Sequence, residues 1–362
     1  MKFKITLKPI GPYFFGTERG YGENNKVSYF ATSRKYPQQT TLLGMLRYRL
    51  LEMHGWLNDG KGNWGGSSFD DRKALIGPRS FKPDRAANRV DYGCIKRIGP
   101  VWLEQNGELL LPGNLDRGYS YQNHGGTVTL GGFDYKNSTQ AHLTTASAKL
   151  DDQQPIFLRT ERVGITKGRD DGDEKAFYKQ ENWQLAANTE FVFYTDLDEM
   201  EGKKLADFVT KIPTVKMGGE NSRFRMIMIQ ADAPSGNDWT TYRTETDYDR
   251  LVCLSDTWLP YETQQEFAYG VFEPTFFRNI VTSSEKTKNF WVHPKKDRTD
   301  APHKSGGYHL LRRGSVLYAP SERLEELIEQ ILEQTAGWQQ IGYNHFVRQS
   351  GEDISYNIFK TP

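Results

Sequence analysis

The order in which strands and helices follow one another is the feature of this sequence that most constrains its fold. Residues 2–8 alternate apolar with basic or polar side chains, as a half-buried strand does. The elements predicted up to residue 231 are strand 2–8, a helix that follows Pro37, is capped by Thr40 or Thr41 and stops at Gly55, strands 94–98, 101–111 and 190–195, helix 197–212, and strand 224–230. A strand–helix–strand unit, here with strands 94–98 and 101–111 after its helix, is followed by a second strand–helix–strand unit, and this order is typical of a ferredoxin-like domain, in which two helices cover one face of an antiparallel sheet.

The second half of the chain fits a degraded copy of the first, although the two halves share too little identity to define a repeat. The loop 231–238 (ADAPSGND) marks a boundary between domains 1–231 and 232–362. The elements predicted beyond it are strands 250–254, 271–281, 290–293 and 314–319, a helix capped by Ser321 that runs to 334, and a last strand at 341–347 around Gly342. Two stretches, 56–92 and 112–155, show no clear period and are interpreted as insertions.

Composition and charge exclude several classes of protein. The 362 residues carry 47 Lys and Arg against 46 Asp and Glu, which excludes a uniformly basic coat and an acidic tail. Aromatic residues make up 13% of the chain and supply a core. The only cysteines, Cys94 and Cys253, exclude a disulfide scaffold and a cysteine-rich zinc module. No apolar run has the length of a membrane span, so we expect a soluble protein of the cytoplasm with no membrane partner.

Basic residues are concentrated in three stretches, although the total charge is near zero. Eight Lys and Arg lie between Lys286 and Arg313, six between Arg79 and Arg97, and four in 159–169. Basic side chains beside aromatic residues suit a nucleic-acid backbone together with base stacking. A solvated surface explains any one stretch about as well, but three together favour a polyanionic ligand.

No cofactor or metal site is predicted. The seven histidines show no metal-ligand spacing, and the chain contains no phosphate-binding loop of the nucleotide-hydrolase type and no GxSxG nucleophile motif. His345 is the histidine most worth testing as a general acid or base, although a structural role is far more common for such a residue.

Five segments, in order, resemble the RAMP superfamily of CRISPR-associated proteins. They are SRKYPQQTTLLGMLRYRLL (33–51), RVGIT followed by AFYKQENWQL (162–185), MGGENSRF (217–224), LLRRGSVLYAPS (310–321) and WQQIGYNHFVR (338–348). The length of the chain, the GGE turn (218–220) and the GSVLY strand (314–318) are most similar to the subunit of the type III-B (Cmr) effector complex that binds the 5′ handle of the crRNA. The equivalent subunit of the type III-A (Csm) complex is the close alternative.

The resemblance implies an α+β fold with two ferredoxin-like (RRM-like) domains in tandem, the second degenerate, with long loop insertions. It implies a non-catalytic RNA-binding subunit that contacts the crRNA 5′ handle, the large polymerase-like subunit and the first backbone RAMP subunit of the filament, with target RNA nearby. Carried over to this chain, the RNA contacts are Arg34, Lys35, Thr40, Thr41, Gly44, Arg47, Arg162, Gly164, Lys167, Arg169, Gly218, Gly219, Asn221 and Arg223. Tyr36, Tyr178 and Phe224 are the aromatic neighbours on which bases would stack.

Two other functions stay open at this point. One is a metal-independent crRNA-processing endoribonuclease of the same superfamily, with His345, His54 or Tyr13 as acid or base. The other is an unrelated two-domain scaffold whose basic loops are plain surface. The glutamates along helix 321–334 likewise have two interpretations, a solvated face or a docking face for a basic subunit.

Overall fold

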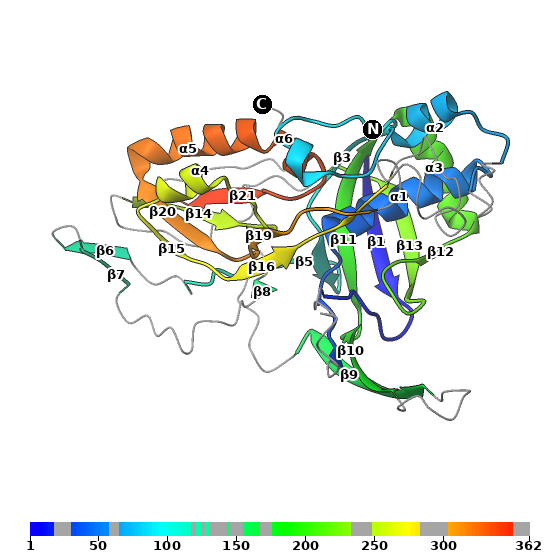
Figure 1. Ribbon diagram of the computed structural model, residues 1–362, viewed down its shortest axis with the longest axis horizontal. Coiled ribbons are helices and arrows are strands. Elements are labelled where there is room, and N and C mark those ends of the chain that lie inside the picture. The colour runs from blue at the N-terminus through cyan, green and yellow to red at the C-terminus, as the bar shows by residue number, and fades with distance from the viewer. Residues whose placement is uncertain are drawn as a thin grey trace.

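The structure is a computed structural model with an antiparallel sheet in each half of the chain (Figure 1). It describes residues 1–17, 30–57, 65–116, 121–124, 127–130, 143–144, 155–166, 176–232, 248–282 and 303–349. The predicted α+β class is confirmed. None of the helices in these ranges is long and apolar enough to span a membrane.

The first sheet is built around β1, which pairs with the two strands next to the second helix of this half. Its strands, from one end to the other, are β12 (Thr214–Lys216), β13 (Arg223–Gln230), β1 (Lys2–Pro9), β11 (Thr189–Leu197), β4 (Trp102–Gln105), β5 (Glu108–Pro112) and β8 (Leu143–Thr144), and β3 (Ile95–Ile98) also pairs with β11. All these pairings are antiparallel. With α1 (Gln39–Met53) and α3 (Glu199–Lys211), the predicted elements of this half follow one another in the expected sequence β1, α1, β3, β4, β5, β11, α3 and β13, with further elements between them.

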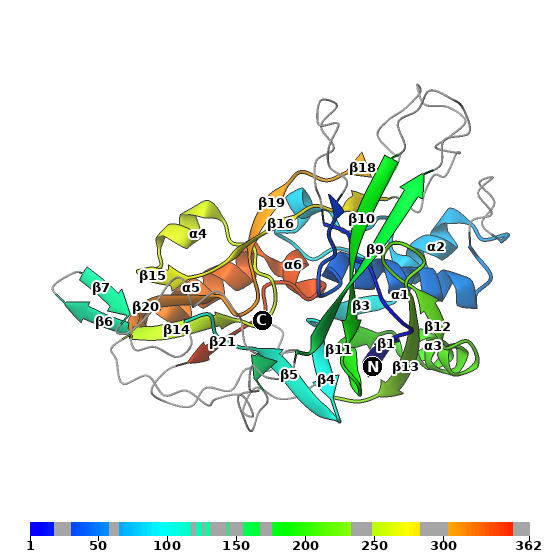
Figure 2. The ribbon, with the colours of Figure 1, turned by 90° about the horizontal axis from the view of Figure 1, so that it is seen from below.

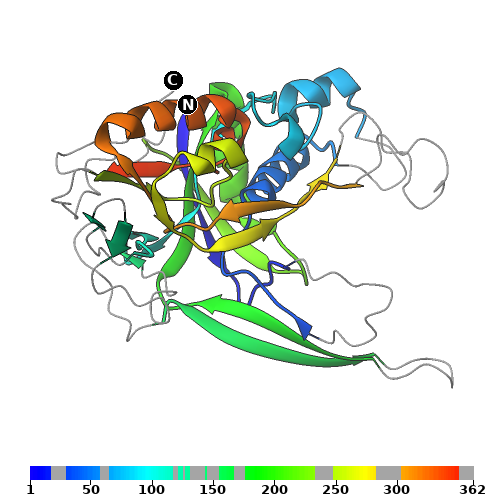
Figure 3. The same cartoon turned by 60° about the vertical axis from the view of Figure 1, so that its left-hand side comes forward.

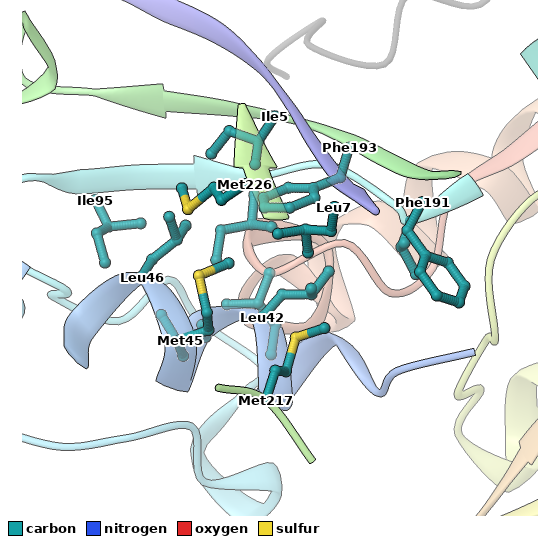
Figure 4. Packing of buried hydrophobic residues seen from close by; sticks show 14 of the residues in the cluster. Ile5, Leu7, Leu42, Met45, Leu46, Ile95, Phe191, Phe193, Met217 and Met226 are labelled. Carbon is teal, nitrogen blue, oxygen red and sulfur yellow. The ribbon is translucent and has the colours of Figure 1, made fainter. Parts of the chain in front are cut away.

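Apolar side chains of α1 pack directly on this sheet. Figure 4 shows Leu42 and Leu46 of α1 beside Ile5 and Leu7 of β1, with Met226 of β13 next to them. All five are buried, because the apolar positions of the helix recur on one face while those of β1 alternate. This packing fixes the position of the first turn of α1 relative to the sheet.

Two local predictions in this half are wrong. The helix α1 begins at Gln39 with Gln38 as its N-cap, and no side chain caps it, so neither Thr40 nor Thr41 has that role. The stretch 56–92 also contains regular structure, namely α2 (Phe69–Ile76) and a short 3₁₀ turn, η1 (Pro83–Arg85). A helix of two turns is too short to establish a visible apolar period.

The second half of the chain has an antiparallel sheet of four strands. Its strands, from one end to the other, are β15 (Tyr269–Val271), β20 (Val316–Pro320), β14 (Tyr248–Cys253) and β21 (Phe346–Gln349), all antiparallel. The helices of this half are α4 (Tyr261–Gln265), α5 (Ser321–Gln334) and α6 (Ala336–Gln340). α5 spans the predicted range, but Ser321 is its first residue and Pro320 its N-cap. The predicted strand 341–347 is displaced, since 341–345 is a loop and β21 starts at Phe346.

Short ribbons extend from the two sheets. They are β9 (Phe157–Thr166) with β10 (Ala176–Leu185) and β2 (Phe30–Ala31), β16 (Pro274–Phe277) with β19 (Tyr308–Leu311), β17 (Ile280–Val281) with β18 (His303–Lys304), and β6 (Tyr121–His124) with β7 (Thr127–Leu130). The predicted strand 271–281 is therefore broken into three pieces, and the predicted strand 290–293 lies outside the described residues. In Figures 1 and 3 the β9–β10 hairpin projects from the body of the molecule.

The two halves form lobes that share buried contacts. Trp102 and Val192 of the first sheet pack against Val252 and Val316 of the second, and the Trp102 Nε1 donates to the backbone oxygen of Leu254 at 3.1 Å. The core cluster of the first sheet also includes aromatic residues of the second lobe, namely Phe277, Trp338 and Tyr343. The lobes are thus joined by apolar packing and not only by the linker between them.

Candidate nucleic-acid interface

The first turn of α1 lies at the junction of the two lobes. Gln39 is buried, and its Nε2 donates to the backbone oxygens of Gly99 at 2.9 Å and Ile341 at 3.1 Å. Thr40 and Thr41 are half-buried and Gly44 is exposed, so part of this helix start faces solvent. Backbone amides at a helix start favour anions, and here they are held in place from both lobes.

The loop 341–345 reaches the helix start because it contains a glycine. Gly342 has a φ of +95°, a region that favours glycine, and a Cβ there would overlap Gln39 Nε2 and lie 2.5 Å from the oxygen of Gly99. Tyr343 is buried next to Thr40 and to the charge of Arg34, and burial raises the pKa of its hydroxyl. The final glycine loop and the first helix, 302 residues apart in sequence at Gln39 and Ile341, therefore form one local structure.

Cations from both lobes meet next to this turn. The guanidinium of Arg34 donates to Thr275 Oγ1 at 3.2 Å and to the backbone oxygen of Phe276. Arg313, from the second lobe, donates to the backbone oxygen of Val101 at 2.7 Å and stacks 4.1 Å over the ring of Tyr36. Arg34 and Arg313 thus tie the lobes together from opposite sides of the junction.

Lys35 is the exposed member of this group. Its Nζ lies 5.2 Å from the ring of Trp183 and 5.5 Å from that of Phe157. Burial of the ammonium and the charge of Arg312 lower its pKa. Arg312 pairs with Glu273 and keeps about a third of its side chain in solvent. We call Arg34, Lys35, Arg312 and Arg313 the junction cations.

Nearby carboxylates partly neutralise the charge of the junction cations. Glu273 pairs with Arg312, and Asp256 Oδ1 lies 3.4 Å from the Nε of Arg313. Lys35 has no ion pair within the described residues, although the charges of Glu273 and Glu181 act on it. The positive charge available to a ligand therefore centres on Lys35 and the exposed part of Arg312.

Arg47 lies elsewhere than the sequence-based site implies. It is buried against α2, where its Nε donates to the backbone oxygen of Ile76 at 3.1 Å, and burial lowers its pKa to about 10. Phe224 is also buried, stacked 5.8 Å from Phe15, so its ring offers no face to a base. Both residues belong to the core of the first lobe.

Residues 159–166 of the predicted basic stretch belong to β9, which pairs with β10 in an antiparallel ribbon (Figure 2). Arg162 is exposed on β9 opposite Gln180, and Gly164 lies opposite Tyr178. Lys167 and Arg169 lie outside the described residues, as does the side chain of Tyr178. The hairpin carries ion pairs on its surface, such as that of Lys179 with Glu161 at 2.6 Å. Within the described part of the chain, Arg162 takes no part in these ion pairs.

The glycine pair before β13 approaches the chain's own backbone. Gly218 has a φ of +81° and a Cβ there would lie 2.5 Å from the oxygen of Phe14, which also accepts from the N–H of Gly219 at 2.9 Å. Asn221 and Arg223 are exposed beyond this turn. The glycines therefore allow a close contact with the chain's own backbone at Phe14, and the exposed side chains of Asn221 and Arg223 remain accessible to a ligand.

The three side chains considered as acid or base, His345, Tyr13 and His54, lie in different environments. His345 is fully buried, and burial lowers its pKa to about 3. Tyr13 is buried with its hydroxyl donating to the backbone oxygen of Lys35 at 2.8 Å, and burial raises its pKa. His54, near the end of α1, contacts Glu201 at 2.7 Å. Within the described residues no cluster of three or more His, Cys, Asp or Glu could hold a metal ion.

Sequence reasoning identified Arg34 and Lys35 but missed their partners. Arg312 and Arg313 were part of a long basic stretch, and Trp183 was part of a motif that carried no assigned contact. The adjacent arginines directly before the GSVLY strand were the signal that could have singled them out. Their proximity to Lys35 depends on packing between the lobes, which no local pattern encodes.

Comparison with known proteins addresses the fold. No known family profile and no curated protein sequence matches the chain. A chain of a type III-B Cmr-β complex bound to cognate target RNA and AMPPNP matches with a TM-score of 0.51 at 15% identity, over 99% of this chain and 100% of that one. A second structure of Cmr-β bound to cognate target RNA gives 0.51 at 14% identity with the same coverage.

This chain has the fold of a protein from a type III-B CRISPR complex. The likeness extends over the whole of both chains, so it includes the junction between the lobes. A chain of a Csm3–Csm4 subcomplex of type III-A matches at a TM-score of 0.39 and 11% identity, over 88% of this chain and 92% of that one, a value too low to carry an argument. The comparison therefore supports the fold that the RAMP resemblance implies.

Proposed function

We propose that this chain is a non-catalytic RNA-binding subunit of a type III CRISPR effector ribonucleoprotein, which holds the 5′ handle of the crRNA. The observation that carries this proposal is the meeting of Lys35 and Arg312 beside the first turn of α1. These cations come from different lobes of a fold shared, over its full length, with a chain of an RNA-bound type III-B complex. The equivalent role in a type III-A complex is the alternative within the same proposal.

The junction suits a single strand of RNA for physical reasons. Lys35 and Arg312 offer charge to phosphates, and the exposed part of the α1 start offers backbone amides. Trp183 and Phe157 lie directly beneath the Lys35 ammonium and keep it in a partly apolar setting. A charge in such a setting interacts more strongly with a phosphate than a fully hydrated one does. The contacts of Thr40, Thr41, Gly44, Asn221 and Arg223 with RNA are part of the same proposal.

A binding role is favoured over RNA cleavage by the state of the candidate acid–base groups. His345 has no exposed surface and a strongly lowered pKa, so it stays neutral and out of reach of a 2′-hydroxyl. Tyr13 is committed to the Lys35 backbone oxygen. His54 sits at the opposite end of α1 from the junction cations.

The domain organisation and partners belong to the same proposal. We propose two ferredoxin-like domains, 1–231 and 232–362, with the first helix of the second reduced to α4, and the separate antiparallel sheet in each half supports this division. We propose contacts with the large polymerase-like subunit and with the first backbone RAMP subunit. The glutamates of α5 are exposed in the structure and are available for one of these contacts.

The decisive experiment compares binding of the purified chain to a labelled crRNA with and without its 5′ handle. We expect handle-dependent binding that leaves the RNA intact. The double variant Lys35→Ala, Arg312→Ala should bind the handle about tenfold to a hundredfold more weakly, because each removed cation costs roughly 0.7–1.4 kcal/mol of phosphate contact.

The matched control removes two exposed lysines of α3, with Lys203→Ala and Lys211→Ala, and should bind like the wild type. Equal binding of the two double variants would refute the junction as the RNA site. RNA cleavage by the wild type would favour the endoribonuclease, and binding that ignores the handle would refute the assignment of the ligand.

A further inference from the structure

A second group of cations lies on the open face of the first sheet. Lys8 of β1 is directly opposite Arg225 of β13, and Lys216 of β12 is directly opposite Arg223 of β13. Opposite residues of antiparallel strands share a face, as do residues two apart in one strand. All four side chains are exposed and point away from the helices. We call them the sheet-face cations.

This arrangement places like charges directly opposite each other on neighbouring strands, which is unfavourable in a sheet. Like charges directly opposite each other on neighbouring strands repel, and here two such pairs are adjacent. Within the described residues none of the four is in an ion pair with a carboxylate. The charge of Lys8 acts on Glu190, and Glu220 lies in the turn before β13. The group therefore keeps a net positive charge.

The same face carries apolar surface next to the charge. Ile227 and Ile229 of β13 are 45% and 52% exposed, although their neighbours Met226 and Met228 are buried. The other half of this sheet face, at Val192 and Trp102, is covered by the second lobe. The uncovered half thus combines exposed cations with exposed aliphatic side chains, and its cations suit the phosphate backbone of a nucleic acid.

A continuous set of contacts links the sheet-face cations to the junction cations. Ile10 donates its N–H to the oxygen of Arg223 at 2.8 Å, and Phe14 donates to Ser222 Oγ at 2.9 Å. One residue further on, Phe15 accepts the N–H of Arg34 at 2.7 Å. Residues 10–15 therefore run beside the turn at 218–222, with Arg223 bonded near one end of this segment and Arg34 at the other.

We propose that the sheet-face cations bind successive phosphates of a single-stranded RNA that also contacts the junction cations. The inference rests on the proposed function, because it extends the RNA path of that site. Residues two apart on a strand are separated by roughly 6.6 Å and opposite residues by about 5 Å, so the cations form a regular grid that suits a chain of repeating charges. Arg223 and Arg225 supply guanidinium forks that match phosphate oxygens.

The test uses the salt dependence of binding to the handle-containing crRNA. Each phosphate contact with a single strand contributes about 0.7 to the slope of log K against log salt. The variant Lys216→Gln, Arg225→Gln should therefore lower the slope by about 1.4 and keep the preference for RNA with a handle. Its melting temperature should match or exceed that of the wild type, because the change removes repulsion at exposed positions.

The control Lys203→Gln, Lys211→Gln removes two charges on α3 and should leave the slope unchanged. An unchanged slope in the sheet-face variant, with handle preference intact, would overturn this inference and leave the proposed function standing. Absence of RNA binding by the wild-type chain would overturn both. Binding of an oligoglutamate peptide that this variant loses, at an unchanged RNA slope, would instead assign the surface to an acidic protein partner and overturn the RNA assignment.

Discussion

Gly342 shows how one residue can hold the candidate site together. The amide of Gln39 occupies the space in which any side chain at 342 would lie, and the same amide ties the start of α1 to the oxygens of Gly99 and Ile341. A larger residue would have to displace that amide and also adopt an unfavourable positive φ. The glycine therefore sets the distance between the last loop and the first helix.

We expect Gly342→Ala to lower the free energy of unfolding by about 2–4 kcal/mol, from backbone strain and overpacking together. Chemical denaturation of the purified variant measures this directly. Gly44→Ala is the matched control, because Gly44 lies in α1 with open space around it, and there the change should stabilise the protein by roughly 0.5–1 kcal/mol. Similar stability of the two variants would contradict the packing described for Gly342.

At the scale of single elements, α2 depends on its cap. Ser68 accepts the N–H of Asp71 at 3.1 Å, and Asp71 accepts the N–H of Ser68 at 2.8 Å, which forms a reciprocal capping box. The helix has only two turns, and it buries Leu75 and Ile76 in the first core. A short helix gains little from propensity, so its end contacts count more.

Ser68→Ala should cost about 1 kcal/mol of stability because it leaves backbone amides of the first turn without a partner. Thermal unfolding of the variant beside Ser68→Asn, which keeps a capping oxygen, is the measurement. The asparagine variant should stay close to the wild type. An alanine variant as stable as the asparagine one would show that solvent satisfies the helix start equally well.

The elements differ in how well the sequence predicts them. α3 and the strands around it follow clear apolar periods, and these predictions are confirmed within a few residues. α2 was missed because eight residues do not establish a period, and the segment 271–281 was taken as one strand because its breaks depend on pairing with β19 and β18. In the candidate site, local motifs identified Lys35, whereas Arg312 reaches it only through packing between distant segments.

At the scale of the whole molecule, the two lobes behave as one body. Arg250 of the second sheet is buried and its Nη1 contacts Asp116 Oδ2, at the start of the 112–155 stretch, at 2.8 Å. Asp116 also accepts the hydroxyl of Tyr318. A buried charge that loses its partner is strongly destabilising, so neither lobe leaves the other without a large cost.

We therefore expect a single unfolding transition, with loss of secondary structure and of aromatic packing at the same temperature. Circular dichroism in the far and near ultraviolet measures the two. Fragments 1–231 and 232–362, expressed separately, should fail to show the near-ultraviolet signal of the intact chain. Two well-separated transitions, or a natively packed fragment, would contradict this view of the lobes.

The bond from Gln39 to Ile341 also concerns the order of events during synthesis. A ribosome releases the first helix long before residue 341 is made, so its first turn must wait for nearly the whole chain before its packing is complete. Arg312 likewise reaches Lys35 only late in translation. A truncated product would therefore lack a finished junction, and the capacity to hold RNA there would distinguish complete chains from prematurely terminated ones.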